Sequence, residues 1–416
     1  ANFEAGVISR DVEEAMIQAA DEIIAGKFRD QFITDVIQGG AGTSMNMNMN
    51  EVIANRANEI LGGELGKYDR CHPNDHVNYG QSTNDVVPTA GKLTVQLLIK
   101  DLLTDLQYLY DTLQAKGNEF DHVIKMGRTH LQDAVPIRLG QEFRAFSQPV
   151  LRDIKRISAA VEELTYVNMG ATAVGTGINA DVEYVKNVVR ILSEVTGFEF
   201  KQSPDLVDGT RNLDSFVWLS SALKTCAVNL SKTANDIRLM ASGPKAGLAE
   251  ILLPQQQPGS SIMPGKVNPV IPEVLNQVCF QIFGNDITIT KAAEAGQLEL
   301  NVFEPVLFFN LFQSIEILKN GIITFIENCL KGITAQEENC KYWVDRSVGI
   351  ITALNPHIGY KNAAEIAKES IKTGVPVAQI VLQRGLLSKE DLDVILNPFE
   401  MTKPGIPGKA LLKKNK

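Results

Sequence analysis

Residues 216–241 read FVWLSSALKTCAVNLSKTANDIRLMA and repeat apolar or small residues at heptad spacing. A sustained repeat of this kind predicts a long helix that packs against other helices along one seam. Small residues in the seam allow the helices to approach closely. The seam positions are Ser220, Leu223, Ala227, Leu230, Ala234, Ile237 and Ala241. The stretch predicts a mainly α-helical fold built on a helix bundle.

Other parts of the chain have the same helical periodicity. Apolar residues at steps of three and four predict helices over 12–24, 86–117, 143–164, 270–293 and 306–327. So much seam in one chain indicates packing between subunits as well as within one.

The C-terminal part changes to short helices separated by turns. Residues 361–372 are followed by Gly374 and Pro376, and Ser388 to Asp391 resemble a capping box. These features predict a small C-terminal helical domain. The strand signal is weak, with short candidates only at 171–178 and 197–202.

Charge and composition exclude several classes of partner. The chain has 416 residues and a formal net charge of −9, whereas nucleic acid and anionic membranes require concentrated positive charge. The most apolar stretch, 302–318, is interrupted by polar residues and is shorter than the ~20 residues of a membrane span, so we expect a core helix. Five cysteines without a C-x-x-C pair predict reduced thiols in a cytoplasmic protein.

Chemistry concentrates in residues 259–269, GSSIMPGKVNP. Gly259, Pro264, Gly265 and Pro269 prevent a continuous helix, so the backbone N–H groups of an irregular loop are free to face a ligand. The side chains of this loop include two hydroxyls, an amine and an amide, and such groups are suited to binding an anion. The alternative is an ordinary turn between helices, which seldom needs a lysine and an asparagine as well.

Three further polar clusters stand out against the helical background. The stretch 39–44, GGAGTS, leads into a helix start that attracts anions, although a plain N-cap is the alternative. The stretch 81–85, QSTND, has five hydrogen-bonding side chains where a cap needs one. The third, 127–130, GRTH, contains one of only five histidines, and a purely structural histidine is the alternative there. No His, Cys or carboxylate group has the spacing of metal ligands.

The four clusters together resemble the fumarase/aspartase superfamily of lyases, whose signature is Gly-Ser-Ser-x-Met-Pro-x-Lys-x-Asn-Pro. The resemblance covers essentially the whole chain. Within the superfamily, five segments are most similar to the sequences of aspartate ammonia-lyases: 39–44, 82–84, 168–172, 238–247 and 272–274. It implies reversible deamination of L-aspartate to fumarate and ammonia, by proton abstraction from C3 through an aci-carboxylate. Fumarate hydratase and a catalytically inactive structural relative remain as alternatives.

The resemblance implies a role for each site residue. Thr43, Ser82, Thr83 and Ser261 would hold the β-carboxylate, and Lys266 and Asn268 would hold the α-carboxylate. Ser260 would be the base, and Met263 would also line the substrate site. The leaving ammonium would lie among Thr43, Asn84, Thr129 and His130, with Glu273 orienting His130. No cofactor is implied to be required, and magnesium activation is left open.

The resemblance also implies a homotetramer whose core is a large helix bundle and whose active sites each combine segments from three subunits. We expect three domains: an N-terminal domain over 1–84, a central long-helix bundle over 85–338 and a small helical domain over 339–416. Members of the family carry roughly 50 further residues before the point where this sequence begins, so we expect the first domain to lack that segment.

Overall fold

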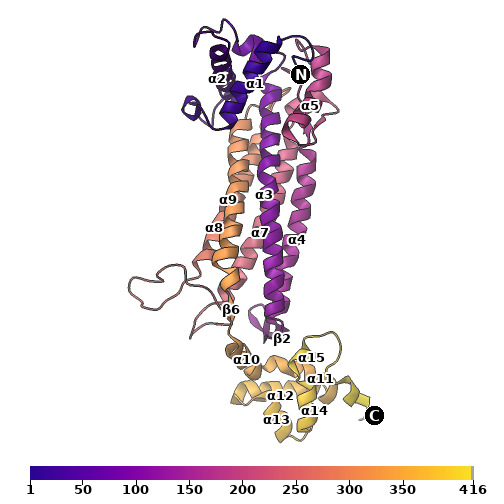
Figure 1. The fold of residues 1–416 in the computed structure, drawn as a ribbon. Helices are drawn as coiled ribbons and strands as arrows, with labels where there is room; N and C mark the ends of the chain where they lie inside the picture. Colours follow the sequence, from indigo (N-terminus) through magenta and orange to yellow (C-terminus); the bar gives the residue numbers. More distant parts are fainter. Residues whose placement is uncertain (414–416) are drawn as a thin grey trace. The chain divides into compact units, whose positions relative to one another are not determined.

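The computed structural model describes residues 1–413 and is mainly α-helical (Figure 1). Five long helices account for much of it: α3 (Thr83–Glu119), α4 (Leu139–Glu163), α7 (Asp214–Met240), α8 (Val270–Glu294) and α9 (Glu304–Asn328). Each coincides with one of the stretches whose apolar periodicity predicted a long helix. The predicted fold class is confirmed.

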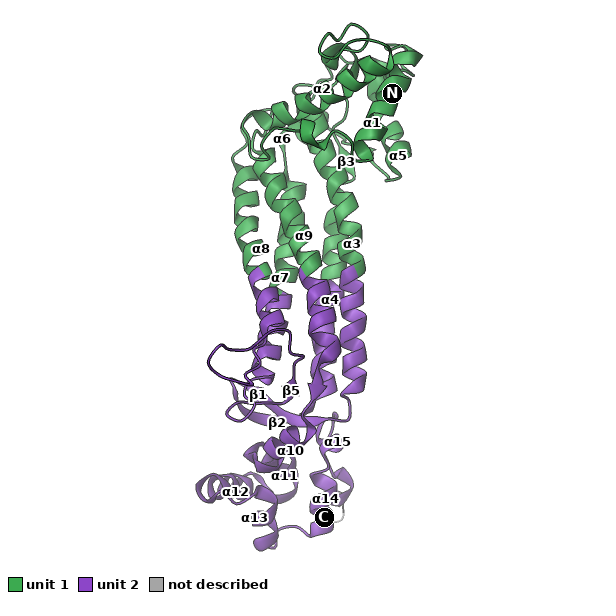
Figure 2. Cartoon of the chain, turned by 60° about the vertical axis from the view of Figure 1, so that its left-hand side comes forward, with its two compact units in different colours: residues 1–104, 153–228, 278–320 green, residues 105–152, 229–277, 321–416 purple. Residues whose placement is uncertain are grey.

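The chain divides into two compact units (Figure 2). Unit 1 comprises residues 1–104, 153–228 and 278–320, and unit 2 comprises residues 105–152, 229–277 and 321–416. Each of the five long helices contributes one segment to each unit. The three domains expected from the sequence, 1–84, 85–338 and 339–416, divide the chain by a different criterion and stay a prediction.

The heptad seam of α7 is buried as its spacing predicted. Ser220, Leu223, Ala227, Leu230, Ala234 and Ile237 are all buried, and Ala241, which follows the helix, is half-buried. Removal of this apolar surface from water is the main favourable term in folding, and the small side chains leave room for neighbouring helices.

Helix α9 is the most apolar of the five long helices. The segment Glu304–Gly332 is long and apolar enough to cross a membrane by length and composition alone, but 44% of its apolar window is buried inside the protein. Leu307, Leu311, Ile315, Leu318 and Ile322 are fully buried. This burial is that of a core helix, as the sequence predicted.

Unit 1 completes its fold with short elements before and between the long helices. They are α1 (Arg10–Ile24), α2 (Thr43–Ile60), α5 (Val182–Thr196), α6 (Leu206–Arg211) and the short parallel pair β3 (Tyr166–Val167) and β4 (Lys201–Gln202). Helices α1 and α2 pack through alanines, with Ala15 and Ala19 beside Ala54 and Ala57. This packing fixes α2, whose first residue belongs to a predicted site cluster.

Unit 2 contains two antiparallel pairs, β1 (Ile124–Thr129) with β2 (Gln132–Arg138), and β5 (Ile251–Leu252) with β6 (Thr334–Ala335). Neither pair was expected from the sequence. The expectation of a strand at 171–178 is wrong, because this segment turns repeatedly and Gly175 and Gly177 have positive φ. Of 197–202, only the last two residues form a strand.

The C-terminal part of unit 2 is a compact group of short helices, as predicted. They are α10 (Glu337–Arg346), α11 (Ile351–Ile358), α12 (Tyr360–Thr373), α13 (Val377–Gln383), α14 (Lys389–Ile395) and α15 (Pro398–Met401). Leu354, Ile366 and Ile380 are buried in their common core. Ser388 caps α14 by accepting from the Asp391 N–H at 3.0 Å, and Gly374 ends α12 with φ of 72°.

Candidate active site

The cluster at 127–130 lies at the end of the β1–β2 hairpin in unit 2. Thr129 pairs with Gln132, so His130 and Leu131 form the turn. Both turn residues have positive φ, 54° and 60°. Such a conformation costs a non-glycine residue about 1–3 kcal/mol and persists only where the surrounding structure holds it. The hairpin therefore presents Thr129 and His130 at an exposed, strained turn.

Residues 253–269 form an irregular loop between β5 and α8, as the sequence predicted. The loop closes on itself, because Asn268 Nδ2 donates to the Gly259 carbonyl at 2.6 Å. Gly259 is required there, since a Cβ would lie 1.4 Å from the Lys266 carbonyl oxygen. Gly265 has φ of 79°, which L side chains rarely adopt.

Ser260 has the most distinctive hydrogen bonding in this loop. Its Oγ accepts from the backbone N–H groups of Ile262 at 3.2 Å and Met263 at 3.1 Å. Two donors aimed at one oxygen favour the charged form of the group over the neutral form. This geometry can therefore stabilise an alkoxide at Ser260 Oγ better than the surroundings of a serine without such donors.

The other predicted residues of this loop face solvent. Ser261, Met263 and Lys266 are exposed. Glu273 lies on the first turn of α8 and forms an ion pair with Arg238, with 3.6 Å between Oε1 and Nη2. Among residues 1–413, no hydrogen bond or ion pair joins Glu273 to His130.

In unit 1, the cluster at 39–44 is a turn that leads into α2. Ala41 and Gly42 have φ of 58° and 86°, which directs the chain into the helix at Thr43. Thr43 Oγ1 donates to the Gly40 carbonyl at 2.7 Å, and its side chain is exposed. An exposed hydroxyl thus lies at the N-terminus of an 18-residue helix, where backbone N–H groups attract negative charge.

Side chains from other elements hold the segment 82–84 in place at the start of α3. Thr83 is buried, and its Oγ1 accepts from Asn46 Nδ2 at 3.2 Å. Asn84 Nδ2 donates to the Ala173 carbonyl at 2.7 Å, and the Asn84 carbonyl accepts from Asn168 at 3.0 Å. Ser82 Oγ accepts from the Asn84 N–H at 3.2 Å.

Asp85 fixes the backbone of the same segment. Its carboxylate is fully buried and accepts three backbone N–H groups, from Ser82 at 2.9 Å, Gly170 at 3.2 Å and Thr172 at 3.0 Å. Burial raises the pKa of Asp85 to about 6, and the three N–H donors oppose that rise. Asp85 therefore ties the Ser82–Asn84 turn to the turns at 168–175.

The predicted site residues are divided between the two units. Thr43, Ser82, Thr83 and Asn84 belong to unit 1, and Thr129, His130, Ser260, Ser261, Met263, Lys266, Asn268 and Glu273 belong to unit 2. Their assignment as site residues stays a prediction. Sequence reasoning gave no separate role to Asp85 or Asn168, because a buried polar residue cannot be distinguished from an exposed one by type alone.

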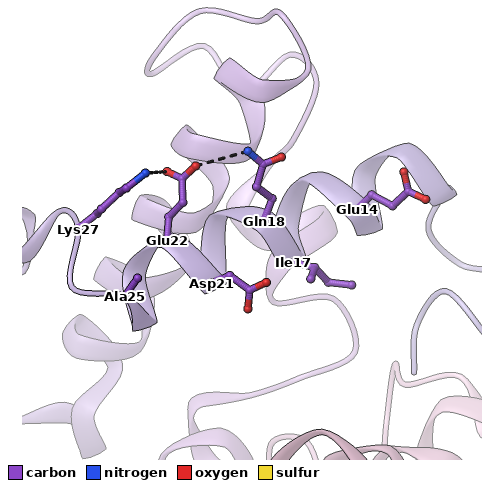
Figure 3. Close-up of a pocket in the computed structure, with 7 residues that line it drawn as sticks. All are labelled: Glu14, Ile17, Gln18, Asp21, Glu22, Ala25 and Lys27. Carbon is purple, nitrogen blue, oxygen red and sulfur yellow. Dashed lines mark hydrogen bonds and ion pairs between the residues drawn. The ribbon is translucent and has the colours of Figure 1, made fainter.

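One groove in unit 1 has no connection with these clusters (Figure 3). It lies along α1 and is lined by Glu14, Ile17, Gln18, Asp21, Glu22, Ala25 and Lys27. Glu22 is already engaged there, because it pairs with Arg56 at 2.9 Å and with Lys27 at 3.6 Å. The Arg56 guanidinium lowers the pKa of Glu22 to about 2. This groove is not a candidate active site.

Metal ligation finds no support in the part of the chain that the structure describes. Within residues 1–413, no group of three or more His, Cys, Asp or Glu side chains could hold a metal ion. The expectation that no cofactor is required stays a prediction.

Comparison with known proteins identifies the family. A lyase family model matches residues 1–284, and a model of the fumarase C C-terminus matches residues 350–403. The aspartate ammonia-lyase of Bacillus subtilis (strain 168) is 58% identical over 414 residues, which cover 100% of this chain and 87% of that relative. The chain belongs to the aspartate ammonia-lyase family. The aspartate ammonia-lyase of Escherichia coli (strain K12) is 49% identical, over 98% of this chain and 86% of that relative.

Solved structures place the chain in the wider fumarase/aspartase superfamily. The fumarate lyase:delta crystallin of Brucella melitensis matches with a TM-score of 0.94 and 48% identity, over 97% of this chain and 87% of that chain. The class II fumarase of Schistosoma mansoni matches with a TM-score of 0.92 but 36% identity, over 97% of this chain and 88% of that chain. The predicted fumarase/aspartase superfamily is confirmed.

The raised pKa of Asp85 predicts a pH-dependent stability. A carboxyl whose pKa rises on folding, here from 3.8 to about 6, stabilises the fold most below pH 3.8 and loses that contribution as pH rises through 6. Two pKa units correspond to about 3 kcal/mol. We expect the free energy of unfolding of wild type relative to Asp85→Asn to fall by a few kcal/mol between pH 4 and pH 7, measured by urea unfolding.

The matched control is Asp35→Asn, which changes an exposed aspartate of the same unit. It should follow wild type across this range. A pH-independent difference between wild type and Asp85→Asn would contradict the assignment of a raised pKa to Asp85.

Proposed function

We propose that this chain, a carbon-nitrogen lyase by family, catalyses the reversible deamination of L-aspartate to fumarate and ammonia. The observation that carries the proposal is the graded similarity. Relatives named aspartate ammonia-lyase are 49–58% identical over nearly the whole chain, whereas the class II fumarase is 36% identical. The four polar clusters of the sequence support the same chemistry.

The first step that we propose is proton abstraction from C3 by Ser260. The electron pair of the C–H bond moves into the β-carboxylate, which becomes an aci-carboxylate with two negative charges. A serine hydroxyl is a poor base, so its alkoxide must be favoured by the protein. The two backbone N–H groups that Ser260 Oγ accepts support this assignment.

The charge that develops on the β-carboxylate requires donors. We assign this task to Thr43, Ser82, Thr83 and Ser261, since preorganised donors aimed at developing charge supply much of an enzyme's rate enhancement. Removal of one such donor typically costs roughly 3–4 kcal/mol. The fixed geometry of the Ser82–Asn84 turn, held by Asp85 and Asn168, supports such preorganisation.

The second step breaks the bond between C2 and nitrogen. The electron pair of the aci-carboxylate forms the C2–C3 double bond of fumarate, and the protonated amine (–NH3⁺) leaves C2 as neutral ammonia with the bonding pair. We place the leaving group among Thr43, Asn84, Thr129 and His130. Lys266 and Asn268 would hold the α-carboxylate through a charge-assisted hydrogen bond and an amide, with Met263 beside the substrate. We assign no required cofactor.

The active form that we propose is a homotetramer in which each site combines segments of three subunits. Several predicted site residues, Thr43, Thr129, His130 and Lys266, are exposed in the single chain. Large apolar side chains on α8, Val274, Phe280 and Ile287, are also exposed there, which is typical of surfaces covered on assembly. Glu273 would then orient the His130 of a neighbouring subunit.

We place the enzyme in the cytoplasm. The five cysteines are buried and form no disulfide within residues 1–413, and burial raises the pKa of Cys71 to about 11, so that thiol stays protonated and unreactive.

The substrate assignment is tested by the ultraviolet absorbance of fumarate. We expect purified chain to release fumarate from L-aspartate and not from L-malate, and to consume fumarate when ammonium is supplied. Activity on malate with none on aspartate would replace the proposal with a hydratase. Absence of activity on both would favour an inactive structural relative.

Ser260→Ala tests the base. We expect turnover to fall by about four powers of ten or more while substrate affinity is largely kept, because the proton acceptor is lost without loss of a carboxylate contact. Ser261→Ala is the matched control and should lower turnover by about 10²- to 10³-fold, as for loss of one donor. If Ser260→Ala loses affinity but keeps turnover, Ser260 is a binding residue.

Mixing of inactive subunits tests the shared site. After reversible dissociation, a mixture of Ser260→Ala and His130→Ala subunits should regain activity at about a quarter of its sites. These are the sites that receive Ser260 from a His130→Ala subunit and His130 from a Ser260→Ala subunit. Native mass spectrometry of tagged subunits verifies the exchange. Exchanged tetramers that stay inactive would contradict a site built from different subunits.

A further inference from the structure

A buried cluster of four charged side chains in unit 2 has no part in the proposed chemistry. Its members are Lys125 and Arg128 of β1, Glu142 of α4, and Glu250 immediately before β5. Glu250 is fully buried and Lys125 is 3% exposed. Two cations and two carboxylates balance one another, which is the condition under which charges are tolerated away from water.

Glu250 makes two contacts across this cluster. Its Oε1 lies 2.6 Å from Arg128 Nη1, and its Oε2 lies 2.8 Å from Lys125 Nζ. Glu142 forms an ion pair with Lys125 at 2.8 Å, and among residues 1–413 no ion pair or hydrogen bond joins it to Arg128. Glu250 is therefore the member that holds both cations of β1.

Arg128 is adjacent to the proposed Thr129–His130 segment. The strand is irregular at this point, because the β1–β2 register shifts between Met126 and Arg128. A Cβ on Gly127 would approach the Val135 carbonyl oxygen to 2.7 Å. Arg128 Nη1 also donates to the Met126 carbonyl at 3.1 Å. The guanidinium thus bridges the bulge to Glu250 just before the strained turn at His130 and Leu131.

The backbone of Glu250 is equally well fixed. Its N–H donates to the Met240 carbonyl at 2.9 Å, at the end of α7, and its carbonyl accepts from the Gln336 N–H at 2.8 Å. Residues 251–252 then pair with β6, and the chain continues into the loop that carries Ser260. One residue therefore joins the hairpin, through its side chain, to the root of the loop, through its backbone.

We propose that Glu250 is a positioning residue: through Arg128 it holds the Thr129–His130 turn against the root of the 253–269 loop. The proposal rests on the proposed function for its catalytic consequence. A strained turn keeps its conformation only where its surroundings hold it. Loss of the Glu250 contact should let the turn relax and should loosen the loop at its root.

Glu250→Gln is the test, because it keeps the shape of the side chain and removes its charge. We expect faster backbone hydrogen exchange, followed by mass spectrometry, in peptides that cover 124–138 and 251–269. In the same variant, kcat for aspartate should fall by about 10- to 100-fold with a smaller change in KM, as for a small misplacement of catalytic groups.

Glu142→Gln is the matched control. It removes a carboxylate from the same cluster and from the same lysine, but leaves Arg128 bound to Glu250. If the effect were only a general loss of stability, both variants should be affected alike. The proposal instead requires that Glu142→Gln keep wild-type exchange at 251–269 and kcat within about twofold of wild type. If Glu250→Gln fails to fold, Arg128→Lys replaces it, since it keeps the charge and loses the fork geometry.

Each outcome decides the proposal. Unchanged exchange in both peptides, equal effects in Glu142→Gln, or altered exchange with unchanged kcat would each overturn it. A wild-type chain that is inactive on aspartate would instead refute the proposed function, and the exchange measurements would still decide whether Glu250 holds the turn to the loop.

Discussion

The burial of long apolar helices is the constraint on which the other features depend. Three of the four segments that bear the predicted chemistry are attached to the ends of these helices: residues 82–84 enter α3, the β1–β2 hairpin joins α3 to α4, and the loop at 253–269 leads into α8. A helix whose seam is packed cannot slide or rotate without exposing apolar surface. The burial of side chains such as Ala227 and Leu230 therefore fixes positions where irregular backbone can carry function.

Buried carboxylates fix the irregular segments at the ends of the helices. Asp85 gathers three backbone N–H groups under the Ser82–Asn84 turn, and Glu250 gathers two cations beside the Thr129–His130 turn. In both places an irregular segment that packs little apolar surface is held by polar contacts in a poorly solvated setting, where such contacts are strong and costly to break. The proposed site therefore relies on a few buried charges for its geometry.

Sequence reasoning succeeded where a pattern is local. The five long helices and the Ser388 cap follow from spacing within a few turns of chain, and the loop at 259–269 follows from its glycines and prolines. It failed at the β1–β2 hairpin. Lys125 is almost wholly buried and Arg128 is largely buried, although both are charged, so the sequence lacks the alternation of apolar and polar residues that indicates a strand. It also predicted a strand at 171–178, where glycines with positive φ instead produce turns.

By itself, the sequence determined the mainly helical class and the residue types of the four clusters, since these depend on composition and spacing within the chain, and its resemblance to known lyases indicated the superfamily. Tertiary structure decided the rest: that Glu273 pairs with Arg238, that Asp85 meets Gly170 and Thr172, and that Glu250 reaches Arg128. These partners are separated by 35 to more than 100 positions. Only the packing of the helices brings such residues close enough to pair, and no local pattern encodes that approach.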